Sequence, residues 1–415
     1  MFMKNYTMIG ALAIVVAALL WSLDGTFLRP QLYTLPSVFL VFLEHTLGFI
    51  ILVPFLFIFK SQLKTISKKQ WLTIFWVALF GGALGTTFMT KALFLTGFKD
   101  ISVVILLQKF QPIFAITLAT IFLRERFPKR FYAYATIAVI AGYFVTFKDP
   151  FTINKVGGAA AQMILYSLLA AFAWGSSTTF GKYSLKNINY GLLAALRFGF
   201  TILIMALPAL YYYHGQFTLV STRQWTTLAI IVFTSGAAAM WLYYFGLKKI
   251  PASLATLCEL SWPVSAIVFD YWLNHNVLSW SQLLGTAVLI IAVYKVTILN
   301  KPRTITGTVE AGLGQGKDLG MKTANLNVSI ANKLPKGLYT CEILYDNQKY
   351  SGLLYYGHNS ISQKDCLEVH MFDFASEIYG QKITVTTGKY LRLPKKFKDP
   401  KDLMAQIQKD VRNAK

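Results

Sequence analysis

The segment ALLWSLDGTF at Ala18–Phe27 has a close counterpart in the middle of the chain, AFAWGSSTTF at Ala171–Phe180. A second pair lies further along. TGFKDISVVILLQKFQPIFAI at Thr96–Ile116 matches FGLKKIPASLATLCELSWPVSAI at Phe245–Ile267 when two extra residues are allowed in the second copy. Trp, Gly, Pro and Lys recur at matching places, which biased apolar composition alone does not readily produce. These pairs predict that the first three hundred residues contain two copies of one unit.

Long apolar runs with few charges surround these repeated segments. The hydrocarbon core of a bilayer requires about 20 apolar residues per helix, with a range of about 17–25. Runs of that kind fall at about 8–24, 37–59, 71–93, 101–122, 131–148, 159–178, 190–210, 224–244, 252–272 and 281–298. So many runs with so few charges argue against the buried helices of a large soluble protein. They predict an all-α, polytopic membrane domain of ten transmembrane helices.

Acidic residues mark the end of this membrane domain. The chain has 18 acidic side chains, and the seven in residues 1–300 are Asp24, Glu44, Asp100, Glu125, Asp149, Glu259 and Asp270. Residues 301–415 hold the other eleven together with eighteen basic side chains, which is the composition of a water-soluble domain. We therefore expect two domains, at residues 1–300 and 301–415.

Most basic residues of the membrane domain lie in short loops, as topology determinants do. With a cytoplasmic N-terminus, 13 of them fall on the inner side, and the six on the outer side are Arg29, Lys91, Lys99, Lys148, Lys155 and Arg223. This asymmetry predicts a multi-pass protein of the cell (inner) membrane whose N-terminus and C-terminal domain are cytoplasmic. It also accounts for much of the net charge of +22 without nucleic acid. The lipid bilayer is the expected partner.

The two copies, at about residues 8–148 and 159–298, each contain five predicted spans. Because five is odd, the second copy must cross the membrane upside down relative to the first. Inverted repeats of this kind are typical of transporters, whose substrate binds near the midplane between the halves.

The 5+5 arrangement resembles a known transporter family. Each half has a Trp in its first span, and Pro112 and Pro263 lie in spans four and nine. These features resemble the EamA-type branch of the drug/metabolite transporter superfamily over residues 1–300. The resemblance implies a transporter, is compatible with homo-oligomers, and does not identify the substrate.

Four ionisable residues, Glu44, Lys109, Arg197 and Glu259, are predicted within the membrane. A charge at the bilayer centre costs about 2.5–3.5 kcal/mol even on the lenient insertion scale, so such residues are functional candidates. In the repeat alignment Glu44 is equivalent to Arg197, and Gln108 to Glu259. Glu44 and Arg197 can then form a buried pair that either lines a cavity or only locks the two halves together. EamA-type relatives often have an Arg at both positions; Arg197 keeps this pattern and Glu44 departs from it.

We expect one transport cavity between the halves, lined by Asp24, Glu44, Gln108, Lys109, Trp174, Arg197, Glu259 and Trp262. Flat aromatic faces beside hydrogen-bonding groups suit an uncharged aromatic ligand with many hydroxyl groups. Anchoring at the membrane interface and core packing are the alternative roles for each Trp.

After Asn300 the hydrophobic period changes to two. TCEILYD, KYSGLLYYG, CLEVHMFDF and KITVTTG are short and rich in strand-forming residues. In CLEVHMFDF, Leu367, Val369 and Met371 fall on one face, and Glu368 and His370 on the other. The final DPKDLMAQIQKDVRNA has apolar residues at helical spacing after Pro400. The tail is therefore predicted to be a small antiparallel β-barrel with a C-terminal helix.

Several motifs follow one another in this tail: GLGQGKDLGMKTAN at Gly312–Asn325, LPKGLY at Leu334–Tyr339, EVHMFDF at Glu368–Phe374, then IYGQKI and YLRLPKKF. In this order they resemble riboflavin kinase over about residues 303–415. The resemblance implies a flavin as substrate and product, ATP as co-substrate, and Mg²⁺.

The resemblance also implies roles for individual residues. The phosphate-binding residues are Gly312, Gly314, Gly316 and Lys317 together with Thr323 and Asn325; the last two also hold Mg²⁺, and Glu368 is the catalytic base. Glycine-rich backbone can bring its N–H groups close to phosphate, and phosphoryl transfer depends mainly on positioning and charge neutralisation. Lys322 stands where the family has Pro.

The leading hypothesis joins the two domains: a membrane transporter takes up riboflavin, and the cytoplasmic kinase converts it to FMN with ATP. Two alternatives remain open. The membrane domain transports another small metabolite beside a tethered riboflavin kinase, or the tail is a catalytically weak domain that senses flavin or nucleotide.

Overall fold

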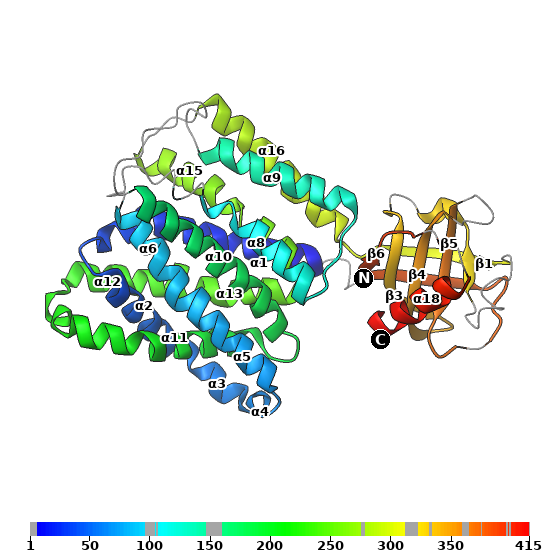
Figure 1. Cartoon of the computed structure of the whole chain (residues 1–415), viewed down its shortest axis with the longest axis horizontal. Coiled ribbons are helices and arrows are strands. Elements are labelled where there is room, and N and C mark those ends of the chain that lie inside the picture. The colour runs from blue at the N-terminus through cyan, green and yellow to red at the C-terminus, as the bar shows by residue number, and fades with distance from the viewer. Residues whose placement is uncertain are drawn as a thin grey trace. The chain divides into compact units, whose positions relative to one another are not determined.

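The computed structural model describes residues 6–95, 104, 107–146, 160–274, 279–311, 323–331, 334–358, 365–374, 376–395, 397 and 400–414. These residues form two compact units, a helical one within residues 5–299 and a second formed mainly by residues 300–415. Figure 1 shows the first as helices and the second as a barrel of strands with one helix. The structure thus places the change of architecture where the composition changes.

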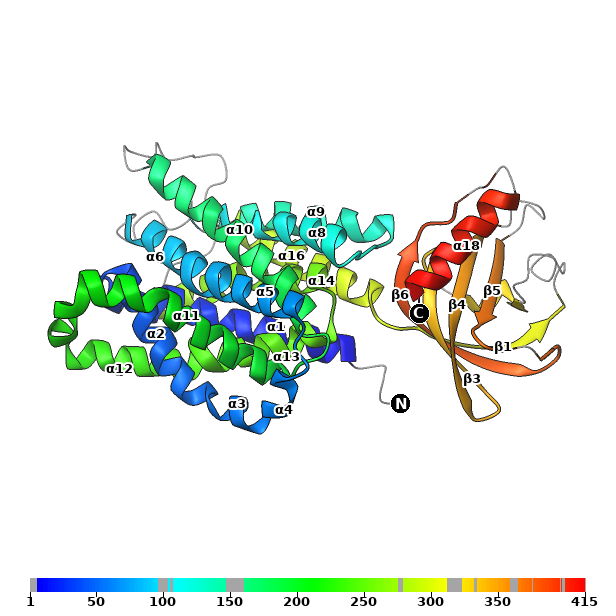
Figure 2. The same cartoon turned by 60° about the horizontal axis from the view of Figure 1, so that its bottom comes forward.

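The helical unit contains six described segments that are long and apolar enough to cross a membrane: Thr7–Leu32, Lys68–Leu95, Ala161–Ser184, Tyr190–Leu219, Thr222–Lys249 and Trp280–Leu299. The helices within them are α1 (Tyr6–Leu23), α5 (Lys68–Trp76), α6 (Gly85–Leu95), α10 (Ala160–Ser184), α11 (Tyr190–Tyr213), α12 (Thr222–Ile231), α13 (Ala237–Lys249) and α16 (Trp280–Leu299). In both views α5 and α6 run beside α10, and both helices are in contact with it (Figures 1 and 2).

The other four predicted spans coincide with helices that are shorter, interrupted or less apolar. These helices are α2 (Ser37–Leu52), α3 (Pro54–Ile58), α4 (Lys60–Leu63), α8 (Gln111–Phe122), α9 (Lys129–Thr146), α14 (Ala252–Cys258) and α15 (Ser261–Asn274). Pro54 has no N–H to continue the ladder of α2, which explains the break in the predicted span 37–59. The predicted span 252–272 is divided at Glu259, between α14 and α15.

Two of the long segments begin in the same way. Ser67 caps α5 in a reciprocal capping box with Gln70, and Ser221 caps α12 with Gln224. Each segment then passes through a π-helical stretch, Val77–Leu84 in the first and Val232–Gly236 in the second. A further π-helical turn, Asp24–Leu28, follows α1. Such turns interrupt the regular helical ladder and are frequent at functional sites.

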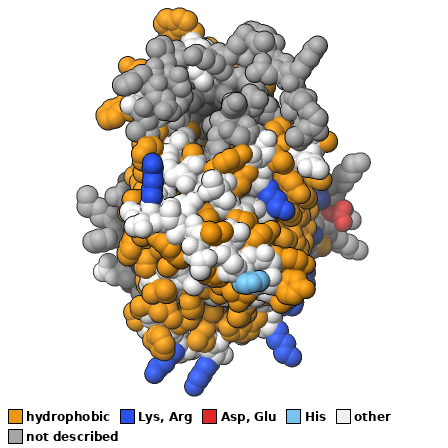
Figure 3. Space-filling view, turned by 90° about the vertical axis from the view of Figure 1, so that its left-hand side faces the viewer, with side chains coloured by type: hydrophobic (Ala, Val, Ile, Leu, Met, Phe, Trp, Pro, Cys, Tyr) orange, Lys and Arg blue, Asp and Glu red, His pale blue; other side chains and the backbone are white. Residues whose placement is uncertain are grey.

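The surface of the helical unit is largely apolar. Trp280, Leu207 and Trp272 expose 87%, 76% and 75% of their surface. Figure 3 shows one face of the molecule on which apolar side chains predominate and charged ones are few. Large exposed apolar patches mark surfaces that meet an apolar environment. Together with the six apolar segments, this surface identifies the unit as a membrane domain.

The second unit is a closed barrel of six antiparallel strands: β1 (Thr304–Glu310), β2 (Ala324–Leu326), β3 (Gly337–Tyr345), β4 (Gln348–His358), β5 (Asp365–Met371) and β6 (Lys382–Arg392). Their order around the barrel is β1-β2-β5-β4-β3-β6, and pairing of β1 with β6 closes it. Closure leaves no free sheet edge. The predicted barrel is confirmed.

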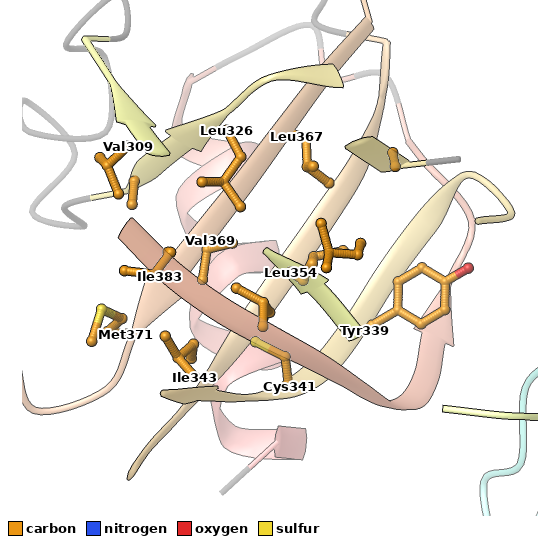
Figure 4. Close-up of a cluster of buried hydrophobic side chains, with 14 of the residues drawn as sticks. Val309, Leu326, Tyr339, Cys341, Ile343, Leu354, Leu367, Val369, Met371 and Ile383 are labelled. Carbon is orange, nitrogen blue, oxygen red and sulfur yellow. The ribbon is translucent and has the colours of Figure 1, made fainter. Parts of the chain in front are cut away.

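Side chains that point alternately into and out of the barrel along each strand form the barrel core. Leu367, Val369 and Met371 point inward from β5, beside Ile343 and Leu354 (Figure 4). The predicted faces of β5 are therefore correct. A short 3₁₀ helix, Val328–Ala331, follows β2, and the predicted C-terminal helix is α18 (Pro400–Ala414). It places Val411 and Ala414 against a second apolar cluster outside the barrel, formed by Leu338, Leu353 and Phe372.

Truncation of Ile343, which is fully buried in the barrel core, should destabilise a fragment comprising residues 301–415. Ile343→Ala is expected to lower the free energy of unfolding by about 2–5 kcal/mol, and Ile343→Val by about 0.5–1.5 kcal/mol, because a cavity adds to the lost transfer energy. Urea unfolding followed by circular dichroism measures both. An Ala variant as stable as the parent fragment would show that this side chain does not belong to the core.

Candidate functional site

The membrane domain contains a cavity of about 220 Å³. Its lining includes all eight residues that the sequence predicts there: Asp24, Glu44, Gln108, Lys109, Trp174, Arg197, Glu259 and Trp262. They come from six of the predicted spans, so only the fold brings them together. Their role in transport remains a prediction.

An ion cluster occupies one part of the lining. Arg29 Nη2 lies 2.7 Å from Asp24 Oδ2 and 3.0 Å from Glu44 Oε1. Nη1 of the same guanidinium donates to Thr90 Oγ1 at 3.3 Å. The sequence interpretation placed Arg29 in an outer loop, and this is wrong. The chain continues as helix to Leu32, and the π-helical turn after α1 carries Arg29 to a buried position beside both carboxylates.

The predicted pair between Glu44 and Arg197 does not form. Arg197 Nη2 instead donates to the carbonyl oxygen of Gly81 at 2.6 Å, and Nη1 contacts Tyr244 Oη at 3.3 Å and Met240 Sδ at 2.6 Å. Glu44 already has Arg29 as its cation, while Arg197 is held by neutral acceptors. A sequence alignment of the repeats pairs these positions by symmetry, but the local helix geometry decides the actual partners.

Glu259 lies where α14 gives way to α15, within a network of neutral donors. Gln111 Nε2 donates to Glu259 Oε2 at 2.6 Å, and Tyr243 Oη donates to Oε1 at 2.9 Å. Tyr243 Oη is also 2.7 Å from Thr178 Oγ1. Three helices therefore position one carboxyl group at the cavity wall.

Lys109 and Gln108 form the wall on the side of Trp262. Lys109 Nζ lies 5.5 Å from the centre of the Trp262 ring, a cation–π contact. Among the residues that the structure describes, Lys109 has no carboxylate within ion-pair distance. Gln108 Nε2 donates to the carbonyl oxygen of Ser167 at 2.8 Å. Trp174 uses its indole N–H in another bond, to the carbonyl oxygen of Gly81 at 3.2 Å.

Several buried polar atoms of the lining have no hydrogen-bond partner among the described residues. They are Asp24 Oδ1, Gln108 Oε1, Arg197 Nε and Thr256 Oγ1. Leaving such a group unpaired is unfavourable by about 1–3 kcal/mol. These atoms are shielded from the cavity space, so a solute reaches them only if the side chains turn. The lining as a whole combines polar and aromatic side chains, which suits a hydrogen-bonding solute with an aromatic part.

Most of the 28 lining residues were not predicted from the sequence, and Arg29, Thr178 and Tyr243 are three that help to hold the buried carboxyl groups of the lining in place. Asp24 and Arg29 are five residues apart, the spacing of a π-helical turn, and that spacing was the available signal for Arg29. Thr178 and Tyr243 are ordinary polar residues of apolar helices, and nothing in the sequence distinguishes them.

In the barrel, the predicted metal ligand and the predicted base are neighbours. Asn325 on β2 is paired with Glu368 on β5, and Glu368 is paired with Tyr355 on β4. Directly opposite residues have Cβ atoms about 4.5–5.5 Å apart and point to the same face. Inward-facing residues flank Asn325 and Glu368, so both side chains lie on the outer face of the barrel. Thr323 immediately precedes β2.

The glycine-rich motif, which contains Gly312, Gly314, Gly316, Lys317 and Lys322, lies outside the described residues. The strands that flank it are described. Glu310, at the end of β1, is paired with Asn325. The loop between β1 and β2 therefore begins and ends beside the row that contains Asn325 and Glu368.

A thiol and a phenol share this outer face with Glu368. Burial and the neighbouring Glu368 carboxylate raise the pKa of Cys366 to about 12. Burial and the nearby Cys366 thiol also raise the pKa of Tyr355 to about 12, against the opposing effect of Arg392. Both groups are therefore protonated at neutral pH. Glu368 is then the candidate proton acceptor of the row.

The donor set fits a magnesium ion. The Thr323 hydroxyl and the Asn325 amide oxygen are hard oxygen ligands of the kind that Mg²⁺ selects, and it usually keeps several waters beside them. Their position next to a carboxylate adds negative charge to the site. Thr323 and Asn325 would hold the ion, which would neutralise charge on bound phosphate groups.

Comparison with known protein families matches both units. A family model described as the EamA-like transporter family matches residues 8–147 and again residues 161–298. A family model described as riboflavin kinase matches residues 299–415. The two matches to the first family coincide with the two predicted copies, at about residues 8–148 and 159–298.

Individual proteins resemble one unit or the other. The riboflavin transporter ImpX of Fusobacterium nucleatum is 42% identical over 295 residues, which cover 70% of this chain and 98% of that protein. A bifunctional riboflavin kinase/FMN adenylyltransferase of Haemophilus influenzae is 36% identical over 123 residues, or 28% of this chain and 39% of that protein. The chain thus spans well under half of that relative.

One solved crystal structure resembles the membrane domain. It is 16% identical, covers 70% of this chain and 96% of its own, and has a TM-score of 0.53. At that identity the likeness shows the fold alone.

Removing Arg29 should leave Asp24 and Glu44 as two buried carboxylates without their cation. Breaking a buried ion pair in this way costs about 3–5 kcal/mol. We expect Arg29→Leu to lower the melting temperature of the detergent-solubilised full chain, measured by intrinsic fluorescence. Adding Asp24→Asn and Glu44→Gln to Arg29→Leu should restore much of the lost melting temperature, because the two unpaired buried charges are then removed.

Arg223→Leu is the control, since Arg223 lies in an exposed part of the chain. Unchanged melting of Arg29→Leu, or a triple variant no more stable than the single one, would contradict the structural role of the cluster.

Proposed function

This chain belongs to the EamA-like transporter family and carries a riboflavin kinase domain at residues 299–415, and we propose that it takes up riboflavin and phosphorylates it to FMN in the cytoplasm. One observation carries the proposal. A chain that matches a riboflavin transporter over 98% of that protein's length is continuous with a kinase domain for the same compound. The two activities then act on one substrate in sequence.

The chemistry of the cavity supports a flavin as cargo. Its wall combines aromatic rings, among them Trp174 and Trp262, with polar side chains such as Gln108 and Thr86. Riboflavin combines a flat ring system with amide-like groups and a chain of hydroxyl groups. The rings would contact the flat face, and the polar atoms would bind the amide edge and the hydroxyl groups.

The membrane domain works, in this proposal, as two inverted halves of five spans each. The double family match, the repeated capping boxes of Ser67 and Ser221 and the repeated π-helical stretches support this arrangement. Inversion places the substrate site near the midplane, where each half can expose it to one side in turn. Both termini face the cytoplasm, which puts the kinase domain beside its ATP.

In the kinase site, Glu368 accepts the proton of the attacking ribityl hydroxyl while Thr323 and Asn325 hold Mg²⁺ beside the phosphates. The chemistry that Mg²⁺ would supply there is neutralisation of charge on the transferring phosphoryl group. The resemblance to riboflavin kinase implies that the glycine-rich motif between β1 and β2 would bind the phosphates through backbone N–H groups. The pairing of Asn325 with Glu368 supports these roles, because base and metal ligands must flank the same reacting atoms.

Phosphorylation gives uptake its direction. A phosphate group adds about −1.5 to −2 charges at pH 7. A cavity that suits an uncharged flavin then rejects the product, and the product cannot cross the lipid. ATP is consumed only inside the cell, so even a carrier without an ion gradient accumulates flavin as FMN.

The role of Glu368 can be tested on purified full chain with riboflavin and Mg-ATP. Glu368→Gln keeps the size of the side chain and removes the proton acceptor, so FMN formation should fall by at least about a hundredfold, the low end for a general base. Nucleotide binding, measured by calorimetry, should stay close to that of the parent.

Glu342→Gln is the matched control, because Glu342 lies on β3 in an exposed ion pair with Lys349. It should leave the rate unchanged. Near-parental FMN formation by Glu368→Gln would remove Glu368 from the role of base, and an inactive parent chain would overturn the kinase half of the proposal.

A further inference from the structure

One cation in the cavity lining has no hydrogen-bond partner among the described residues. Lys109 exposes only 4% of its surface, and its Nζ atom lies 5.5 Å from the centre of the Trp262 ring. The other acidic, basic and histidine side chains of the described lining have hydrogen bonds or ion pairs: Asp24, Arg29, Glu44, His45, Arg197 and Glu259. Because a buried ammonium group loses more on leaving water than one aromatic face returns, Lys109 still lacks an acceptor.

The internal repeat shows that the fold does not require a charge at this position. In the matching segments QKFQP (Gln108–Pro112) and ELSWP (Glu259–Pro263), Lys109 is equivalent to Leu260. Both residues lie in a turn that interrupts a span, both are 4% exposed, and both line the cavity. Since a leucine fills the equivalent place in the second half, packing alone does not explain the cation in the first half.

A glycine of α9 makes room for the Lys109 side chain. A Cβ atom at Gly142 would lie 3.3 Å from Lys109 Cδ. At that distance a side chain at position 142 would force the apolar stem of Lys109 to move. Gly142 therefore lets the stem pass close to α9, and the Trp262 ring contacts the ammonium group at its end. The direction of the Lys109 side chain is set by its neighbours.

The two interrupted spans meet beside this ammonium group. Lys109 contacts Trp262, and Gln111 donates to Glu259 at 2.6 Å, so each interruption contacts the other. Glu259 has its own donors in Gln111 and Tyr243, and within the described lining no ion pair joins it to Lys109. A hydrogen-bond acceptor that enters the cavity can therefore bind Lys109 without breaking an existing ion pair.

An ammonium group has three donors and no acceptor, so it suits groups that only accept hydrogen bonds. In riboflavin the carbonyl oxygens that project from the ring edge only accept, whereas the ribityl hydroxyl groups both donate and accept. We propose that Lys109 is a specificity-determining residue that donates a hydrogen bond to a ring carbonyl oxygen of the flavin during uptake. The inference rests on the proposed function, with riboflavin as cargo. This contact distinguishes a flavin from aromatic solutes that have no carbonyl acceptor.

Riboflavin entry into sealed vesicles that contain the full chain and no ATP tests this contact, because the kinase domain cannot phosphorylate without ATP. Initial rates give the half-saturating concentration of riboflavin. Lys109→Leu introduces the residue that the second half has at this place, and Lys109→Met keeps the length of the stem. Both variants should raise the half-saturating concentration about ten- to a hundredfold, the range expected for a lost hydrogen bond to a charged group.

Two riboflavin analogues, in each of which sulfur replaces one ring carbonyl oxygen, separate recognition from a structural role. Sulfur is the weaker acceptor, so in the parent chain one analogue should require a higher half-saturating concentration than riboflavin. In Lys109→Leu and Lys109→Met this difference should disappear, because the donor that distinguishes oxygen from sulfur is gone. A structural role would weaken entry of all three compounds alike, and unchanged ratios between them would overturn the proposal.

Lys69→Leu is the control, because Lys69 is exposed and does not line the cavity, and it should behave as the parent does. External FMN is added as a competitor. If FMN inhibits riboflavin entry in the parent and Lys109→Leu relieves the inhibition, Lys109 binds phosphate, which overturns the proposal. Parent vesicles that take up no riboflavin would overturn riboflavin as cargo. Uptake with unchanged half-saturation in both Lys109 variants would leave the cargo in place and remove the contact.

Discussion

A bilayer supplies neither hydrogen-bond partners nor counter-ions, so each polar group buried in the membrane domain must find its partner within the protein. This constraint explains the arrangement around the cavity. Arg29 joins Asp24 and Glu44, Arg197 is held by a backbone carbonyl, and Glu259 accepts from Gln111 and Tyr243. The π-helical stretches also provide hydrogen-bond partners, because their backbone carbonyl groups accept hydrogen bonds from side chains of other helices.

The same constraint explains why transport and phosphorylation are carried out by separate units. The membrane domain can carry a neutral, hydrogen-bonding solute with little loss, whereas a phosphorylated product is excluded by its charge. The barrel provides what the membrane domain cannot, a site that handles highly charged phosphate groups in water. The proposed catalytic residues Asn325 and Glu368 lie on the outer face of a closed barrel, so the packed core inside the barrel supports their strands without occupying the site.

The length of the apolar runs and the distribution of acidic residues were sufficient to predict the two-unit organisation, and the hydrophobic period was sufficient to predict the barrel. The switch to a period of two after Asn300 and the alternation in β5 depend only on local pattern, and the structure agrees with both. The structure also places all eight predicted cavity residues in one lining. The ionisable ones could be predicted because a charged side chain in a membrane helix is costly when it faces lipid and therefore faces the protein interior. Arg29 was misplaced and the Glu44–Arg197 pair was wrong. Both depend on a π-helical turn, whose extra residue per turn changes which side chains meet and leaves little trace in composition. Likewise, ten continuous spans were predicted from apolar length, while Pro54 and Glu259 interrupt the helices locally.

The central claim is that one chain moves riboflavin across a membrane and converts it to FMN on the other side. Sealed vesicles that contain the full chain and are loaded with Mg-ATP test it most directly, with riboflavin added outside and flavins inside separated and quantified over time. The account predicts that FMN collects inside to a concentration above that of external riboflavin, and that vesicles loaded with ADP show no such accumulation. If vesicles opened with detergent form FMN but intact ones do not, the kinase is active and the membrane domain does not deliver riboflavin to it, which contradicts the account.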